Sequence, residues 1–192
     1  MRRELFGVTD AFAEFGIARR PLLDRQAIDV CYHGLAALRH PDRLAGDQSP
    51  LTRLNEARRI LLSDQARLLH LLHLTYPEAP AANSFSPDFE IFSLVGNLEN
   101  STAAFVQKYG QTDSPIAKAL LKTEAVALEK AVREAGEKID ALGRIVFSKI
   151  QDLDSRWPDV TAEELARVAA ESAFFRKWNG SLRKSSVSLL GG

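Results

Sequence analysis

Residues 24–44 read DRQAIDVCYHGLAALRHPDRL, and this stretch decides the first half of the fold. Its first residue, Asp24, is a preferred helix N-cap, and the apolar residues after it recur at helical spacing. Those residues are Ile28, Cys31, Tyr32, Leu35 and Leu38. Pro41 disfavours helical backbone at the residue before it, so the helix must end by residue 40. The stretch therefore predicts an amphipathic helix that leads into a loop containing His40-Pro41-Asp42.

The same periodicity continues on both sides of this stretch. Further helices are expected over residues 10–15, 51–61, 66–74, 89–109 and 114–153, and from residue 161 towards the C-terminus. Ser49-Pro50 is a start signal for the helix after the loop, and Thr161 with Glu164 forms a capping-box signature for the last helix. No segment alternates apolar and polar residues for long enough to indicate a strand. The sequence therefore predicts an all-α protein.

Two features of the organisation follow from proline and glycine. Residues 76–88 contain three prolines and several small polar residues, which is typical of a linker. We therefore expect a helical hairpin domain over residues 1–76, a linker over 77–88 and an antiparallel three-helix bundle over 89–192. The pattern leaves open whether the long helix of the bundle is continuous or bends at Gly136 or Gly143.

Composition excludes several classes of protein. The 192-residue chain has 25 Lys and Arg against 25 Asp and Glu, whereas a general nucleic-acid binder usually has a basic excess. Its single cysteine, Cys31, excludes an internal disulfide, a zinc ribbon and an iron–sulfur ligand set. No apolar run approaches the roughly 18–20 residues of a membrane span, and the N-terminus predicts no signal peptide. We expect a cytoplasmic protein with no metal, cofactor, nucleic acid or membrane partner.

The residue patterns of common active sites are also missing. There is no glycine-rich phosphate loop and no His-Glu-x-x-His sequence. His70 and His73 lie three residues apart on a leucine-rich segment without a neighbouring acid, and we interpret them as residues at the edge of a packed helix. Cys31 lies on an apolar helix face and is interpreted as a small buried residue. The sequence therefore predicts a protein that is not an enzyme.

The tripeptide His40-Pro41-Asp42 is the one short motif that a purely structural role does not explain. It lies in the loop between two amphipathic helices, where Pro41 stiffens the backbone and the flanking side chains are presented to solvent. This pair suits docking to a charged partner surface, although an ordinary turn would use the same residue types.

The first half of the chain resembles a J-domain, the module that engages Hsp70 chaperones, and most closely that of the HscB-type co-chaperones of iron–sulfur cluster assembly. The resemblance covers roughly residues 10–74. Its four stretches are Asp10 to Ile17, Leu23 to Leu35, His40 to Leu44, and Leu54 to Leu74 with its Leu-Asn-Glu-Ala run. It implies that this part binds the ATP state of an Hsp70 and promotes ATP hydrolysis, with His40 and Asp42 making polar contacts that Pro41 holds in place. The remaining implied Hsp70-binding residues, which would supply steering charge, are Arg25, His33, Arg39 and Arg43.

The second half resembles the client-binding bundle of the same family. Phe92 to Glu99 is similar to the helix that contacts the iron–sulfur scaffold protein, and Phe174 to Trp178 is similar to a segment of the last helix. The resemblance implies an iron–sulfur scaffold protein as the client. The implied client-binding residues are Leu94, Val95, Leu98, Glu99 and Phe174. The alternative role of the same residues is to form the bundle core.

The chain also departs from the family pattern. Gly34 and Leu38 stand where J-domains are often basic, and Thr102 and Val106 stand where acids are expected. Two alternatives therefore stay open. The alternatives to an HscB-type co-chaperone are a J-like protein with a different client and a structural interaction module with an inactive J-domain.

Overall fold

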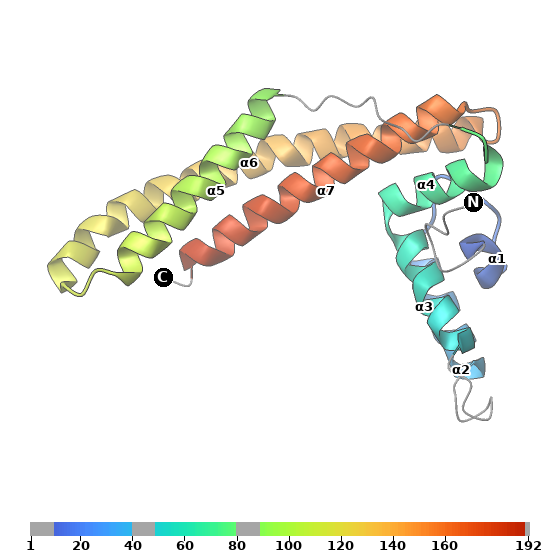
Figure 1. Ribbon diagram of the computed structural model, residues 1–192, viewed down its shortest axis with the longest axis horizontal. Coiled ribbons are helices and arrows are strands. Elements are labelled where there is room, and N and C mark those ends of the chain that lie inside the picture. Colours follow the sequence, from blue (N-terminus) through green and yellow to red (C-terminus); the bar gives the residue numbers. More distant parts are fainter. Residues whose placement is uncertain (1–9, 40–48, 80–88, 191–192) are drawn as a thin grey trace. The chain divides into compact units, whose positions relative to one another are not determined.

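The computed structural model describes residues 10–39, 49–79 and 89–190, and these residues form seven helices and no strand (Figure 1). The helices are α1 (Ala11–Phe15), α2 (Arg25–Leu38), α3 (Ser49–Leu62), α4 (Asp64–Thr75), α5 (Phe89–Gly110), α6 (Pro115–Arg156) and α7 (Ala162–Leu190). The all-α fold predicted from the periodicity is confirmed.

The long helix is continuous. α6 runs over 42 residues and passes both Gly136 and Gly143 without a break. At 1.5 Å per residue its length is about 63 Å. The question that the sequence left open is therefore answered in favour of a single helix.

Contacts group the chain into two compact units, and α6 and α7 contribute to both. The first unit contains Met1–Ser84 and Ser148–Ala170, and the second contains Phe85–Phe147 and Glu171–Gly192. The end of α6 and the start of α7 thus pack with the N-terminal helices, whereas the sequence pattern predicts residues 148–170 as part of the C-terminal bundle.

Side chains at the helix starts of the first unit accept hydrogen bonds from exposed backbone N–H groups. The Asp10 carboxylate accepts from the N–H groups of Phe12 and Ala13 and begins α1, and Asp24 does the same for α2 through Gln26 and Ala27. α1 ends at Gly16, whose φ of 64° lies in the left-handed region that favours glycine. These contacts are local in sequence, which is why the N-cap at Asp24 was predictable.

α1 packs against α2 and α3, α2 packs against α3, and α3 packs against α4. The buried residues of this core are Ala11, Phe12, Phe15, Ile28, Leu54, Ala57, Ile60, Leu61 and Leu71. Trp157, which follows α6, packs against the same core. The end of α6 also makes polar contacts, because the Asp154 carboxylate accepts hydrogen bonds from the Arg20 guanidinium at 2.6 Å and from the Leu22 N–H at 3.1 Å. The Tyr76 hydroxyl donates to the Val160 carbonyl.

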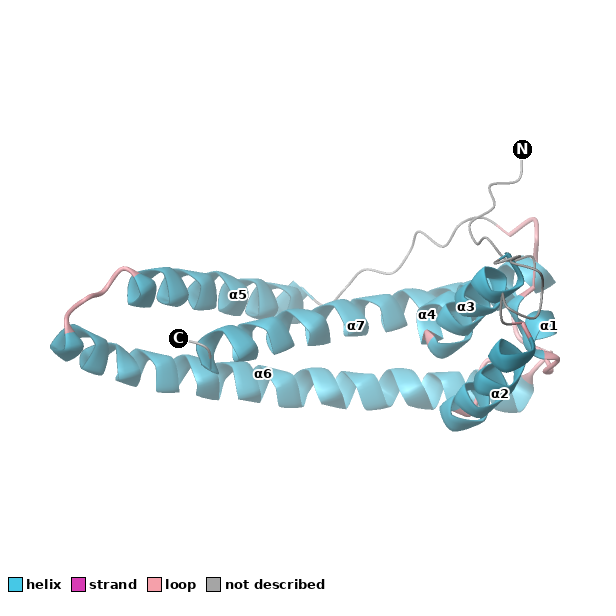
Figure 2. Cartoon of the chain, turned by 90° about the horizontal axis from the view of Figure 1, so that it is seen from below, coloured by secondary structure: helices cyan, strands magenta, loops and turns pink. Residues whose placement is uncertain are grey.

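The second unit is a bundle of α5 with the neighbouring parts of α6 and α7, which run alongside one another in both views (Figures 1 and 2). Its buried residues come from all three helices: Val95, Leu98, Phe105, Leu121, Val132, Ala135, Ile139, Trp178, Leu182 and Leu189. Within each helix these residues are separated by three, four, seven or eleven positions, intervals that place them on one face of an α-helix.

Candidate functional site

Polar contacts fix the position of α2 against α3. The Arg58 guanidinium lies 2.8 Å from the Asp29 carboxylate and 4.8 Å from the centroid of the Tyr32 ring. The Tyr32 hydroxyl donates a 2.7 Å hydrogen bond to Asn55 on α3. Together with the apolar core, these contacts make α2 and α3 the two arms of a hairpin that flank residues 40–48 in sequence.

The residues predicted to bind Hsp70 fall into two groups. His40, Pro41, Asp42 and Arg43 lie outside the described residues. His33 is exposed on α2, with its ring edge-on to Tyr32 at 5.5 Å between centroids.

The two described cations of this set are engaged within the unit. Arg39 contacts Glu14 of α1 through a 2.5 Å ion pair and a hydrogen bond to the Glu14 carbonyl. Arg25 lies 3.8 Å from the Asp64 carboxylate. The structure therefore holds Arg39 against α1, whereas the more exposed Arg25 makes a looser contact.

The pairing of Arg39 is part of a general pattern. Every described arginine between residues 10 and 79 has a carboxylate oxygen between 2.5 and 3.8 Å away. These arginines are Arg19, Arg20, Arg25, Arg39, Arg53, Arg58, Arg59 and Arg67. The first lysine of the chain is Lys108. Internal ion pairs therefore offset the positive charge of the described part of this segment.

Two buried basic groups of α4 have structural roles. The Arg67 guanidinium donates to the carbonyls of Pro21 and Leu61 and to the Asp64 carboxylate, at 2.7, 2.6 and 2.7 Å. Burial lowers the pKa of Arg67, and Asp64 opposes this effect. His70 Nε2 accepts a 2.9 Å hydrogen bond from the Ala11 N–H, so His70 is a buried core residue rather than the edge residue expected from the sequence.

The residues predicted to bind the client lie on α5 and α7 with unequal exposure. Val95 and Leu98 are buried in the bundle core, and Leu94 is half-buried against it. Phe174 is also half-buried and lies 5.7 Å from Trp178 between ring centroids. Glu99 alone of the set is exposed. The amphipathic pattern of α5 had two possible explanations, and for Val95 and Leu98 the packing favours the bundle core.

Exposed aromatic side chains instead lie at the start of α5. Phe89 and Phe92 are 78% and 51% exposed. They are not among the client-binding residues predicted from the sequence, although Phe92 begins the stretch that carries the resemblance. Their exposure is a tertiary property, because α6 and α7 cover another face of α5.

A groove of about 440 Å³ between α5 and α7 includes Glu99 in its lining. Its other lining residues are Thr102, Ala103, Val106, Gln107, Lys184, Ser185 and Ser188. The Thr102 hydroxyl is buried and has no hydrogen-bond partner within the described chain. Thr102 and Val106, where the family pattern has acids, thus form a less charged wall beside Glu99.

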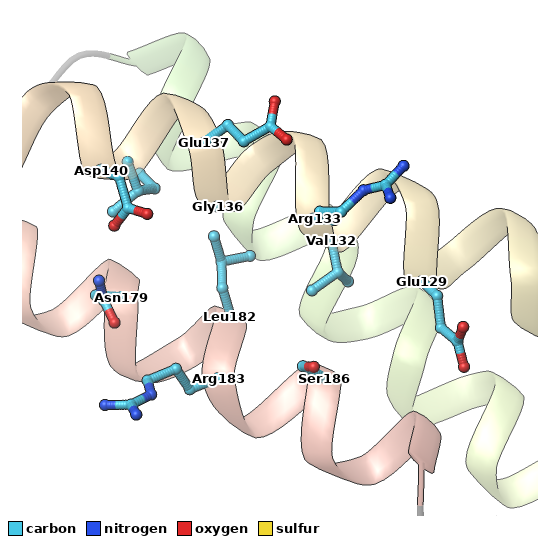
Figure 3. Close-up of a pocket in the computed structure, with 11 residues that line it drawn as sticks. Glu129, Val132, Arg133, Gly136, Glu137, Asp140, Asn179, Leu182, Arg183 and Ser186 are labelled. Carbon is cyan, nitrogen blue, oxygen red and sulfur yellow. The ribbon is translucent and has the colours of Figure 1, made fainter.

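A second groove, of about 610 Å³, lies between α6 and α7 (Figure 3). Val132, Ile139 and Leu182 are the large apolar residues of its lining. Its charged lining residues are Glu129, Arg133, Glu137, Asp140 and Arg183. Carboxylates and guanidinium groups are thus mixed there, which gives the groove no strong single sign of charge.

Over residues 10–39, 49–79 and 89–190 there is no cluster of three or more His, Cys, Asp or Glu side chains able to hold a metal ion. None of the helices in this part of the chain is both long and apolar enough to cross a membrane.

Comparison with known proteins finds similarity to a curated protein over part of the chain. The chain is 33% identical over 90 residues to a curated protein named "Co-chaperone protein HscB homolog" from Azoarcus sp. (strain BH72). The match covers 42% of this chain and 51% of the relative, so the chain spans about half the length of the curated relative it matches. No protein-family model matches the chain. The resemblance to HscB-type co-chaperones predicted from the sequence is confirmed by this similarity.

Proposed function

We propose that this protein is a J-type co-chaperone. Its N-terminal hairpin docks on the ATP state of an Hsp70 through His40-Pro41-Asp42 and stimulates ATP hydrolysis. The hydrolytic groups belong to the Hsp70, so the chain itself is not an enzyme. In this proposal residues 1–76 are the J-domain, 77–88 the linker and 89–192 the client-binding bundle, and the protein acts in the cytoplasm.

One structural relationship carries the proposal. The helices on either side of His40-Pro41-Asp42 in sequence, α2 and α3, pack against each other as a hairpin braced by α1. A packed hairpin whose two helices flank the tripeptide in sequence supports the proposed J-type role. The similarity to an HscB homologue, whose name states a co-chaperone role, supports the same interpretation.

Single-turnover ATP hydrolysis by the Hsp70s of the same organism tests the docking step. We expect acceleration by the wild-type protein and loss of that acceleration with His40→Gln or Asp42→Asn. His73→Gln is the matched control, because it changes an exposed histidine of the same unit outside the docking residues. Acceleration that survives His40→Gln, or no acceleration of any resident Hsp70, would contradict the proposal.

We further propose that the bundle holds an iron–sulfur scaffold protein and raises its effective concentration at the chaperone. Glu99 is exposed on α5 and lines the α5–α7 groove, so it is the predicted client-binding residue with the freest access. Leu94 and Phe174 add partly exposed apolar surface.

Titration of the purified scaffold protein against variants of two grooves tests this assignment. Glu99→Lys is expected to weaken binding at least tenfold, because it inverts the charge at the α5–α7 groove. Glu129→Lys makes the same change at the α6–α7 groove and is expected to leave binding unchanged. If Glu129→Lys weakened scaffold binding and Glu99→Lys did not, the client would bind at the α6–α7 groove and the assignment to the α5–α7 groove would be wrong.

A second candidate function is that of a J-type co-chaperone with a different client. The observation that favours it is the α5–α7 groove, where Thr102 and Val106 replace the acids of the family pattern. No binding of the scaffold protein, together with retained stimulation of Hsp70, would support this second candidate.

A further inference from the structure

One face of α6 in the second unit carries charges of both signs, with a large apolar residue at each end. Its members stand at positions i, i+3, i+7, i+10, i+11, i+14, i+18 and i+21, so they share one side of the helix. They are Val126, Glu129, Arg133, Gly136, Glu137, Asp140, Arg144 and Phe147. We call these eight residues the mixed face. Its middle part, from Glu129 to Asp140, lines the α6–α7 groove (Figure 3).

The mixed face is open to solvent. Every member except the half-buried Gly136 is exposed, and the end residues Val126 and Phe147 are 64% and 49% exposed. A Cβ built at Gly136 would meet no atom within 4 Å, so no packed side chain of the bundle occupies the space beside it. The bundle therefore leaves space along this side of α6 that another molecule can occupy.

Four charged residues of the mixed face are not paired within the chain. Glu129 stands four residues before Arg133, and Asp140 four residues before Arg144, an interval at which ion pairs form inside helices. Neither pair closes to ion-pair distance, and none of the four has another ion-pair partner among the residues that the structure describes. Charges of both signs are thus available to a partner molecule.

The order of charges on the mixed face is complementary to its own reverse. Two copies of α6 can lie antiparallel about a two-fold axis that passes between residues 136 and 137. Arg133 of one copy then faces Asp140 of the other, and Glu129 faces Arg144. Because the axis repeats each contact, every one of these opposite-charge pairs occurs twice.

The same alignment matches the apolar ends and the open centre of the face. Val126 of one copy faces Phe147 of the other, so two exposed apolar side chains become buried against each other. Glu137 faces Gly136 of the other copy, where the missing side chain leaves space for it. Its carboxylate also lies about one helical turn from Arg133 of that copy, which offsets the approach of the two Glu137 side chains.

Other alignments of the two faces bring like charges together. A slide of four residues sets Glu129 against Asp140 in one direction and Arg133 against Arg144 in the other. A slide of three residues in the first direction sets Val126 against Arg144 and loses the apolar contact. A parallel pair sets each residue beside its own copy. Since like charges held opposite each other are unfavourable, the charge order selects the antiparallel alignment.

We propose that the mixed face of α6 binds a second copy of this chain, as an antiparallel and two-fold symmetric pair of α6 helices. Exposed ion pairs are individually weak, so they set the alignment, while burial of Val126 and Phe147 supplies most of the affinity. A contact of one helix against another is small for a specific interface, so we expect a reversible dimer. The inference goes beyond the proposed function, because all its residues lie in the second unit and it involves neither chaperone nor client.

Charge reversal tests the alignment, with the dissociation constant of the dimer measured by sedimentation of the full chain up to about 500 μM. Arg133→Glu sets an acid against Asp140, and Asp140→Arg sets a base against Arg133. Each single variant should therefore weaken the wild-type dimer at least tenfold. The double variant Arg133→Glu/Asp140→Arg has opposite charges in both of these pairs again and should recover most of the affinity.

A mixture of variants separates pairing from folding. In an equal mixture of Arg133→Glu and Asp140→Arg, both facing pairs of a mixed dimer have opposite charges, so the mixture should dimerise where each variant alone does not. Such recovery cannot come from folding, because each chain keeps in the mixture any defect that it has alone. Lys138→Glu is the matched control, since it makes the same charge change at an exposed position of α6 outside the mixed face. It should stay within twofold of wild type.

The proposal is overturned if the wild-type chain is monomeric at the highest concentration, or if neither single variant weakens its dimer. It is also overturned if both single variants weaken the dimer and neither the double variant nor the mixture restores it. A monomeric wild type whose binding of the purified scaffold protein is weakened by Arg133→Glu would assign the mixed face to the client instead. Acceleration of ATP hydrolysis tests the proposed function without these residues, so the two proposals can fail separately.

Discussion

Gly143 of α6 lies directly against the ring of Phe175 of α7. A Cβ built at Gly143 would be 2.5 Å from Phe175 Cε2 and 2.6 Å from Cζ, which is closer than real carbon contacts allow. Both residues belong to the second unit, where Phe175 packs on the bundle core. The missing side chain of Gly143 is therefore what allows the aromatic ring to fill this space between the two helices.

Gly143→Ala is expected to destabilise the protein by about 1–3 kcal/mol, because the Phe175 ring must move out of its place in the packing. Gly136→Ala is the control in the same helix. Its added Cβ would meet nothing within 4 Å, so the higher helix propensity of alanine should stabilise the protein by up to about 1 kcal/mol. Urea unfolding of both variants measures the difference. Equal effects at the two glycines would refute the contact, and adding Phe175→Leu to Gly143→Ala should recover part of the loss.

Stability should fall as the pH drops below about 6.5 because of His70. Burial lowers the pKa of His70 from its ordinary value of 6.5, and the nearby Asp10 opposes this effect. The unfolded chain therefore binds a proton before the folded one does. The contribution of neutral His70 is complete above pH 6.5 and is lost as the pH falls towards the lowered pKa, because a protonated Nε2 cannot accept from the Ala11 N–H.

Unfolding free energies measured between pH 7.5 and 5 check this dependence. His70→Phe keeps a ring at the stacking position against Phe12 but removes both the acceptor and the titration. It should cost about 1–3 kcal/mol at pH 7.5 and show a flatter pH profile than wild type. His73→Gln, at an exposed position of the same helix, should keep the wild-type profile. A profile unchanged by His70→Phe would assign the pH dependence to other groups.

Arg67 is expected to be the most costly charged residue to replace in the first unit. Its side chain is 2% exposed and donates hydrogen bonds to two backbone carbonyls and one carboxylate. Arg67→Met leaves these acceptors without their donor and should destabilise the protein by about 3–5 kcal/mol. Arg67→Lys should recover only part of the stability that Arg67→Met loses, because an ammonium group lacks the planar fork of donors that reaches all three acceptors.

Arg59 provides the comparison for Arg67. It pairs with Glu56 at 2.6 Å on the exposed side of α3, with 62% of its side chain accessible. Arg59→Met should therefore change the unfolding free energy by less than about 1 kcal/mol. Chemical denaturation of the three variants gives the ranking, and similar losses for Arg59→Met and Arg67→Met would contradict the buried role of Arg67.

The N-terminus of α7 should lose stability in acid through Glu164. Hydrogen bonds from the Thr161 N–H, from Arg156 and from the Thr161 hydroxyl lower the pKa of Glu164 from 4.5 to about 2. The folded state thus keeps this carboxylate ionised after the unfolded chain has taken up a proton, so its contribution is complete above pH 4.5 and fades as the pH approaches 2. Glu164→Gln should flatten the decline of the thermal midpoint between pH 5 and 3. Glu163→Gln changes the neighbouring exposed carboxylate and should leave the decline as in wild type.

The helix starts and faces were predictable because their causes are local. Asp24 accepts from the N–H groups two and three residues ahead, and Thr161 with Glu164 forms the reciprocal capping box read from the sequence. A period near 3.6 likewise depends only on residues a few positions apart. These signals were enough to predict the all-α fold and each helix of the second half.

The tertiary structure alone decided which of several equivalent positions has which role. Gly136 and Gly143 are both glycines inside the predicted long helix, and the sequence does not distinguish them. Only Gly143 needs to be a glycine, because the ring of Phe175, 32 residues later in the chain, occupies the space beside it. Val95 and Leu98 fit either a core or a docking face, and packing places them in the core. His70 accepts from a residue 59 positions away, and Asp154 binds Arg20 across 134 positions. An amphipathic pattern shows that a face of a helix is to be buried, but only the folded chain determines what covers it.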